Sequence, residues 1–200
     1  MKQIIISNLR NKKSDTALFR SASDKIANFL AQEASTFVKI KKVPISTPIA
    51  KTVGYASAQN VVLIPILRAG LALLPAFLYY FEKAKVGFIG LKRDEKTFEP
   101  HEYYKNIPKI KENDRVILLD PMLATGGSAV ASVKILNKIG VKESQILCVF
   151  LISAPQGLKN LTTKYPGIKL IVAIKDKTLN KNMYIVPGLG DFGDRYFGTD

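Results

Sequence analysis

The sequence predicts an α/β fold in which a largely parallel β-sheet is flanked by helices. Short apolar runs rich in valine, isoleucine and leucine are the first sign of it: Val61–Leu67, Val86–Leu91, Val116–Leu119, Ile146–Ile152 and Leu170–Ile174. These runs lack the polar–apolar alternation of a strand that has one face in water. Helical patterns at 69–82, 126–139 and 155–164 separate them, as is typical of parallel sheets. A chain of 200 residues fits one domain better than two.

The first element expected along the chain is an amphipathic helix over residues 14–39. Ser14 or Asp15 could cap its N-terminus, because either side chain can accept a hydrogen bond from an N–H of the first turn. Apolar residues recur along it at helical spacing, and four of them are expected to face inward: Leu18, Ile26, Phe29 and Leu30.

Two regions break the alternation of strands and helices. Residues 92–111 are polar and aromatic, too long for an ordinary connection and too polar for the core, which predicts a mobile loop or hairpin over a site. Residues 176–200 are rich in glycine, as a frayed end would be. Apolar anchors between Ile185 and Leu189 instead favour backbone that is held close to another group.

Composition excludes several classes of protein. Hydrophobic residues make up 47% of the chain, which is too high a share for a disordered protein. No apolar run reaches the ~18 residues of a membrane span, and the N-terminus lacks the pattern of a signal peptide. The single cysteine, Cys148, lies in an apolar run, so we expect a buried thiol and a reducing, cytoplasmic location.

The formal net charge of +14 makes the surface attractive to anions, whether nucleotides, polyphosphates or nucleic acid. The lysines are spread along the chain, without the long basic block or the interleaved aromatics that mark a nucleic-acid groove. The charge alone therefore does not choose among these ligands.

The segment between the strand Val116–Leu119 and the next helix carries the strongest functional signal. Ligands of open parallel sheets bind outside the carboxyl ends of the strands, where Asp120 stands. The small residues 124–128 would let backbone N–H groups converge on a phosphate at the helix N-terminus, and Asp120 could bind ribose hydroxyls. The segment lacks both the Walker and the dinucleotide-binding pattern. The alternative is an ordinary turn in which Thr125 or Ser128 caps the helix.

Asp-Pro-Met-Leu-Ala-Thr-Gly-Gly-Ser, residues 120–128, resembles the phosphoribosyl-diphosphate (PRPP) loop of type I phosphoribosyltransferases, and Pro121 is typical of the uracil phosphoribosyltransferases. Residues 65–70 resemble the diphosphate-contacting loop of that family, and residues 184–191 with 197–199 resemble its uracil-binding hood. The resemblance implies a single domain, 1–200, of type I phosphoribosyltransferase fold. Within it we expect an N-terminal helical arm (about 1–40), a core (about 55–175) and a C-terminal hood (about 176–200).

The implied activity is that of a pentosyltransferase in pyrimidine salvage, which transfers 5-phosphoribosyl from PRPP to N1 of uracil. The products would be UMP and diphosphate, formed through an oxocarbenium-like transition state. The resemblance also implies Mg²⁺ held mainly by PRPP and water, GTP as a candidate allosteric effector, and a homo-oligomer, dimeric or larger. Neither a membrane nor a nucleic acid is expected as a partner.

The resemblance assigns roles to individual residues. The catalytic set is Asp120, Arg68, Arg93 and Asp191. PRPP would be bound by Arg68, Arg93, Asp120, Pro121, Met122, Leu123, Ala124, Thr125, Gly126, Gly127, Ser128 and Asp191. Uracil would be bound by Ile185, Gly190, Asp191 and Phe192, in part through their backbone groups.

Two departures from the family pattern and two other functions remain open. Phe192 stands where the family usually has a small residue, so its ring could crowd or cover the site. The segment before Thr16 is short, and the family often uses that arm in subunit contacts. Some proteins of this fold are RNA-binding regulators of pyrimidine genes, although these usually have a second acid in the loop and lack this hood. A transferase for another base, such as xanthine or guanine, is the third candidate.

Overall fold

A computed structural model describes residues 1–93 and 100–199, without the side chain of Arg93. Its centre is an eight-stranded sheet with the main order β10-β9-β7-β3-β5-β6. The strands of this path are β3 (Val61–Leu67), β5 (Phe88–Arg93), β6 (Pro100–Asn106), β7 (Arg115–Leu119), β9 (Ile146–Ser153) and β10 (Lys169–Lys175). Short strands extend it beside β3 and β9, namely β4 (Lys85–Val86) and β8 (Met122–Leu123). Strand β6 runs antiparallel to β5 and the other pairings are parallel, which confirms the predicted fold class.

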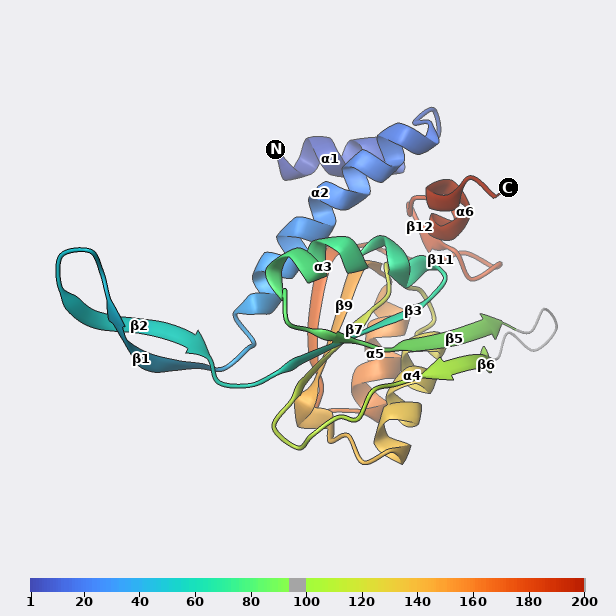
Figure 1. The fold of residues 1–200 in the computed structure, drawn as a ribbon. Helices are drawn as coiled ribbons and strands as arrows, with labels where there is room; N and C mark the ends of the chain where they lie inside the picture. The colour runs from blue at the N-terminus through green and yellow to red at the C-terminus, as the bar shows by residue number, and fades with distance from the viewer. Residues whose placement is uncertain (94–99, 200) are drawn as a thin grey trace.

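Helices cover both faces of this sheet (Figure 1). One layer contains α1 (Lys2–Arg10), α2 (Thr16–Ser35), the 3₁₀ turn η1 (Ala69–Ala72) and α3 (Leu74–Tyr80). The other contains α4 (Gly127–Lys138) and α5 (Pro155–Lys164), with a second 3₁₀ turn, η2 (Glu143–Gln145), before β9. The buried apolar side chains form two hydrophobic clusters, and β3 contributes alternately to both. Val61 and Leu63 belong to one cluster, and Val62 and Ile64 belong to the other. The strand is therefore apolar throughout. None of the helices in the described ranges combines the length and apolar character that a bilayer span requires.

The long N-terminal helix is correct in kind but differs in its inward face. Helix α2 begins at Thr16, and the carboxylate of Asp15 caps it by accepting from the Leu18 N–H at 2.8 Å. Ile26 and Leu30 are buried as predicted, whereas Leu18 and Phe29 are 42% and 46% exposed, so the prediction was wrong for these two. The buried stripe starts instead from Phe19, and half of its eight residues are alanines, which allow α2 to lie close to the sheet.

The polar region at 92–111 forms the hairpin that was one of its two predicted forms. Strands β5 and β6 pair antiparallel with a register shift between Gly90 and Leu91. Residues 94–99, between the two strands in sequence, lie outside the described residues, and the mobility of the segment stays a prediction. The predicted strand Val86–Leu91 is interrupted at Gly87, where an added Cβ would lie 2.9 Å from the carbonyl oxygen of Asn106.

A second hairpin, which the sequence did not reveal, projects away from the sheet (Figure 1). It pairs β1 (Ile40–Ser46) with β2 (Lys51–Ser57) in antiparallel register. Several of its apolar side chains are exposed: Ile40, Ile45, Ile49, Val53 and Tyr55. A two-stranded hairpin is marginally stable in water by itself, so this one is a surface on which another chain could pack.

The glycine-rich tail is ordered, and residues 176–199 are called the hood below. It contains the short strands β11 (Thr178–Leu179) and β12 (Ile185–Val186), which pair antiparallel, and helix α6 (Phe192–Phe197). Ile185, Leu189 and Phe192 are buried in the same core cluster as residues of α1 and α2. The expectation that apolar anchors hold this backbone in place is therefore confirmed.

Candidate active site

The direction of the chain through the sheet changes between β3 and β7. From β3 the chain continues to β5 and β6 on one side, and it then returns to β7 and β9 on the other. In open α/β sheets, ligands bind outside the carboxyl ends of the strands at such a switch point. Arg68 follows β3 and Asp120 follows β7, so the topology places these two predicted residues at the same crevice.

A cleft of about 690 Å³ lies at this position. Its lining combines the three segments that the sequence singled out: residues 66–69, residues 120 and 122–129, and residues 181–185 and 190–193. Leu91 of β5 completes it. One predicted residue, Pro121, does not line the cleft. It is buried, and its carbonyl accepts hydrogen bonds from the N–H groups of Leu151 and Ile152 in β9. Arg93 is the last residue of β5, and its side chain is not among the described ones.

Asp120 lies in the cleft at the end of β7 and is 8% exposed. Its backbone N–H donates to the carbonyl of Val149, and its Oδ1 accepts from the Met122 N–H at 3.2 Å. Burial, and after it the nearby charge of Asp120, raises the pKa of the Cys148 thiol. Cys148 is fully buried, which confirms the expectation of a buried thiol.

The small-residue loop leads directly into α4. Gly126 is the N-cap residue with φ +83°, and no side chain caps this fully described helix. The Thr125 hydroxyl accepts only a long bond, 3.4 Å, from the Gly127 N–H. The alternative of an ordinary turn with a Thr or Ser cap is thus not what the chain adopts. The N-terminal amides of α4 and the partial positive charge of its dipole are suited to an anion.

Helix α5 packs against the backbone of this loop, through residues that the sequence analysis did not identify. Asn160 donates from Nδ2 to the carbonyl of Thr125 at 2.9 Å. Gly157 lies so close to the loop that an added Cβ would be 2.5 Å from the carbonyl oxygen of Ala124. A glycine inside the helical pattern 155–164 was the available signal, because such a glycine often marks a close backbone approach.

Arg68 comes directly after β3, across a cis peptide bond from Leu67. Its guanidinium is 3.7 Å from the carboxylate of Asp194 and 5.8 Å from the ring centroid of Phe197, both in α6. An ion pair this exposed contributes about 0–1 kcal/mol, so a diphosphate could displace it. The turn after Arg68 packs tightly, since a Cβ on Gly70 would lie 2.4 Å from the carbonyl oxygen of Leu119.

The hood contributes a turn whose first residues, 181–183, the sequence analysis did not assign; it leads to the predicted Tyr184. The Asn180 side chain organises it by accepting from the N–H groups of Asn182 at 3.0 Å and Tyr184 at 2.9 Å. Met183 has φ +62°, alone among the described residues other than glycine in having a positive φ. This conformation costs an L-residue about 1–2 kcal/mol.

We expect Met183→Gly to raise the free energy of unfolding by about 0.5 kcal/mol, measured by urea denaturation. Relief of about 1–2 kcal/mol of left-handed strain exceeds the ~0.4–1 kcal/mol that a glycine adds to the entropy of the unfolded chain. The neighbouring change Asn182→Gly brings only the entropic cost, so it should destabilise. Equal losses in the two variants would contradict the argument.

Phe192 and Asp191 occupy different places at the start of α6. The Phe192 ring is fully buried, 5.3 Å from the Phe19 ring and 5.7 Å from the Tyr196 ring between centroids. Its bulk thus anchors the hood to α2 in the core. The exposed Asp191 caps α6 by accepting from the Asp194 N–H at 3.0 Å.

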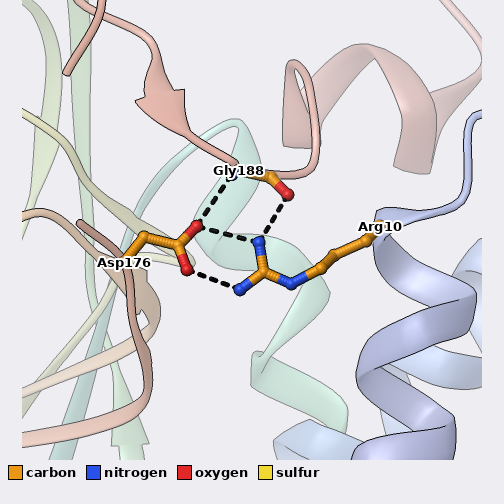
Figure 2. A network of polar contacts seen from close by, with 3 residues as sticks. All are labelled: Arg10, Asp176 and Gly188. Carbon is orange, nitrogen blue, oxygen red and sulfur yellow. Dashed lines mark hydrogen bonds and ion pairs between the residues drawn. The ribbon is translucent and has the colours of Figure 1, made fainter. Parts of the chain in front are cut away.

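Two arginines join α1 to the hood. Arg10 donates to both carboxylate oxygens of Asp176, at 2.9 and 2.5 Å, and to the carbonyl of Gly188 at 2.8 Å, while the Gly188 N–H donates to Asp176 at 2.7 Å (Figure 2). Arg195, in α6 of the hood, donates to the carbonyls of Leu9 in α1 and of Asn11 just after it. It also donates to the carbonyl of Leu189 within the hood. Sequence analysis did not assign a role to Arg10, Asp176 or Arg195.

The Arg10–Asp176 pair predicts a specific pH dependence of stability. Burial opposes ionisation of Asp176, but the hydrogen bonds from Arg10 and from Gly188, with the charge of Arg10, outweigh it and lower the pKa. A lowered folded-state pKa gives stability that is present above the unfolded value, about 3.9, and is lost as pH falls through the folded value. We therefore expect Asp176→Asn to be less stable than wild type at pH 7 by urea denaturation, with the difference shrinking below about pH 4. A constant difference would contradict it.

The donor atoms of the cleft are compatible with magnesium. Among the described residues, no three or more His, Cys, Asp or Glu side chains form a group that could hold a metal ion. Two carboxylates, Asp120 and Asp191, do line the cleft. Mg²⁺ prefers oxygen donors and typically binds through substrate phosphates, waters and one or two carboxylates. The residues present fit that mode of binding.

Comparison with known sequences covers almost the whole chain. A family model described as uracil phosphoribosyltransferase matches residues 2–199. A uracil phosphoribosyltransferase of Limosilactobacillus fermentum is 42% identical over 192 residues, which are 96% of this chain and 91% of that protein. One from Malacoplasma penetrans is 41% identical over 194 residues, covering 97% and 93%.

Solved structures agree with the fold. The AQ2163 protein from Aquifex aeolicus superimposes with a TM-score of 0.90 at 33% identity, over 100% of this chain and 95% of that one. A purine phosphoribosyltransferase from Pyrococcus horikoshii matches with a TM-score of 0.51 at 16% identity, over 78% and 83%. The second likeness concerns the fold alone.

Proposed function

The chain belongs to the uracil phosphoribosyltransferase family and is a pentosyltransferase, and from this premise we propose that PRPP is its donor and N1 of uracil its acceptor. The products are UMP and diphosphate. One observation carries the proposal. Residues 124–128, called the phosphate loop below, line a single cleft together with the turn that contains Arg68 and with the hood. That cleft can bring a phosphorylated sugar and a base together.

The donor occupies the side of the cleft next to the sheet. The 5′-phosphate binds at residues 124–128, where the N-terminus of α4 presents N–H groups and a favourable dipole. Asp120 accepts hydrogen bonds from the ribose hydroxyls. Arg68 binds the diphosphate as a charged, forked donor. Arg93 joins it from the β5–β6 hairpin, and closure of that hairpin excludes water from the reaction.

The reaction breaks the bond between the ribose anomeric carbon and diphosphate, and the bonding electron pair leaves with diphosphate. A new bond forms from N1 of uracil to that carbon, and the N1 proton is released to water. The sugar is oxocarbenium-like in between, so the protein acts by positioning and by stabilising charge. Asp120 faces the developing positive charge, and Arg68 faces the negative charge of the leaving group.

Magnesium fits as the cofactor. Asp120 and Asp191 would hold it together with the diphosphate and water. Bound there, it would supply charge neutralisation to the leaving diphosphate. The residues of the chain bind and orient the two substrates around it.

Uracil binds in the hood. Backbone groups of Ile185, Gly190 and Phe192 pair with its polar edge, and Asp191, which lines the same cleft, completes the site. Gly190 has φ +83°, which leaves its backbone open to close approach. Cytosine is rejected because its exocyclic amine would meet a donor, and a buried polar group without a partner is costly.

A transfer assay tests this proposal. The protein is incubated with PRPP, Mg²⁺ and one of uracil, cytosine, hypoxanthine or guanine, and nucleotide products are separated by chromatography. We expect UMP from uracil only. Absence of UMP from a folded sample would overturn the proposal. The same assay with GTP added tests the expected effector.

We also infer that the protein forms a homo-oligomer. The β1–β2 hairpin exposes Ile45, Val53 and Tyr55 well away from the sheet, and Ile49 at its tip is 96% exposed. A second copy of the chain would remove this apolar surface from water. Light scattering measures the mass in solution, and a mass equal to the 22.1 kDa of one chain would refute the inference.

A further inference from the structure

The network of Arg10, Asp176 and Gly188 lies outside the cleft but controls backbone that reaches it (Figure 2). Both polar backbone groups of Gly188 are engaged, its N–H by Asp176 and its carbonyl by Arg10. Gly188 has φ +64°, and an added Cβ would lie 2.0 Å from the carbonyl oxygen of Ile185. The two ends of this tight turn, Ile185 and Gly190, line the cleft.

We propose that Arg10 is a positioning residue for uracil, which fixes the Gly188 turn and thereby the hood backbone that receives the base. The inference rests on the proposed function, because it assumes that the hood binds uracil. Arg10 does not line the cleft and is connected to it through the backbone of the Gly188 turn. A loss of Arg10 should therefore affect uracil far more than PRPP, whose loop follows β7.

Burial of the network favours a single, defined geometry. The Asp176 side chain is 4% exposed and the Arg10 side chain 26%. The forked guanidinium contacts the carboxylate and a carbonyl at the same time, which restricts the turn more than a single bond would. A lysine in place of Arg10 offers a compact ammonium without this fork.

Arg195 provides an independent reason to assign this role to α1. Its guanidinium donates to Leu9 at 2.5 Å, to Leu189 at 2.7 Å and to Asn11 at 2.8 Å. It therefore joins the residues on either side of Arg10 to the residue that follows Gly188. Leu9 and Leu189 also belong to one buried cluster. The end of α1 is thus fixed against the hood on both sides of Arg10.

Steady-state kinetics of Arg10→Met and Arg10→Lys test the inference, with Lys12→Met as the matched control. Lys12 has the same charge, lies in the same arm, is exposed, and makes no side-chain bond to the part of the chain that the structure describes. For Arg10→Met we expect the KM for uracil to rise about tenfold, equivalent to about 1.4 kcal/mol. The KM for PRPP and kcat should change less than about twofold, well under that tenfold step. Lys12→Met should resemble wild type.

The outcomes separate the inference from the function on which it rests. An unchanged KM for uracil in folded Arg10→Met, or an equal rise in both KM values, would overturn the positioning role. If Arg10→Met does not fold, Arg10→Lys decides, and it should show a smaller rise confined to uracil. A wild-type protein that forms no UMP would overturn the proposed function. The wild-type assay comes first, so this outcome is separate from any effect of the variants.

Discussion

Asp120→Asn should reduce kcat by at least about 100-fold, the scale of losing one preorganised electrostatic group in an active site. The carboxylate lies in the cleft beside the place proposed for the ribose, where its charge would balance the oxocarbenium-like sugar. Asparagine keeps the size of the side chain and an oxygen that can accept from the Met122 N–H. We therefore expect the free energy of unfolding to change by less than about 1 kcal/mol. Single-turnover kinetics and urea denaturation measure the two effects.

Asp114→Asn is the matched control for this experiment. Asp114 is also buried, 3% exposed, but it precedes β7 and accepts from Asn60 at 3.1 Å and from the Lys111 N–H at 2.9 Å. Because it does not line the cleft, its substitution should lower stability and leave kcat nearly unchanged. Normal turnover in Asp120→Asn would remove Asp120 from the catalytic site.

Gly70→Ala is expected to have the second-largest effect, lowering the free energy of unfolding by about 1–3 kcal/mol, as overpacking does. The added Cβ would lie 2.4 Å from the carbonyl oxygen of Leu119 and 3.1 Å from the Cα of Pro65. Both contacts are backbone atoms of central strands, which cannot move aside as a flexible side chain could. The turn must shift instead, and it carries Arg68. A displacement of about 1 Å can cost about 100-fold in rate.

Gly140→Ala separates this steric effect from the general cost of replacing a glycine. Gly140 has φ +88°, but a Cβ there would meet nothing within 4 Å. Gly140→Ala should lower the free energy of unfolding by about 1 kcal/mol, because alanine is strained in the left-handed region. It should keep full activity. Comparing kcat/KM and thermal unfolding of the two variants tests the claim. Equal kcat/KM values for Gly70→Ala and Gly140→Ala would show that the close backbone approach at Gly70 is not needed for activity.

The sheet could be predicted from sequence because its strands are buried on both faces. Runs such as Val61–Leu67 and Ile146–Ile152 have no polar positions, and their short length and their valines and isoleucines favour a buried strand over a buried helix. The β1–β2 hairpin could not be predicted in this way, because its lysines and apolar residues both face solvent. Leu18 and Phe29 were misplaced because apolar character alone does not distinguish a core face from an exposed one.

The cleft was predictable to the extent that its residues cluster in sequence. Asp120 and the loop that follows occupy one stretch between a strand and a helix, and local chemistry suffices to identify them. Arg10 offers no such signal, since its role depends on Asp176, 166 positions away. Gly157 and Asn160 likewise act through the packing of α5 on the phosphate loop. These contacts follow from the tertiary arrangement, and among these residues only Gly157, as a glycine inside a helical pattern, left a signal in the sequence.

The contact between α1 and the hood gives the two halves of the cleft different places in the order of synthesis. Strands β3 and β7, the phosphate loop and its support in α5 are all complete once residue 164 has been made. The hood follows, and its Asp176 and Gly188 then close on Arg10 from the beginning of the chain. The half of the cleft proposed to bind the donor is therefore synthesised in full before the half proposed to bind the base. A chain that terminates before Gly188 would contain the whole of residues 120–128 but would lack Gly190, Asp191 and Phe192, which line the other side of the cleft.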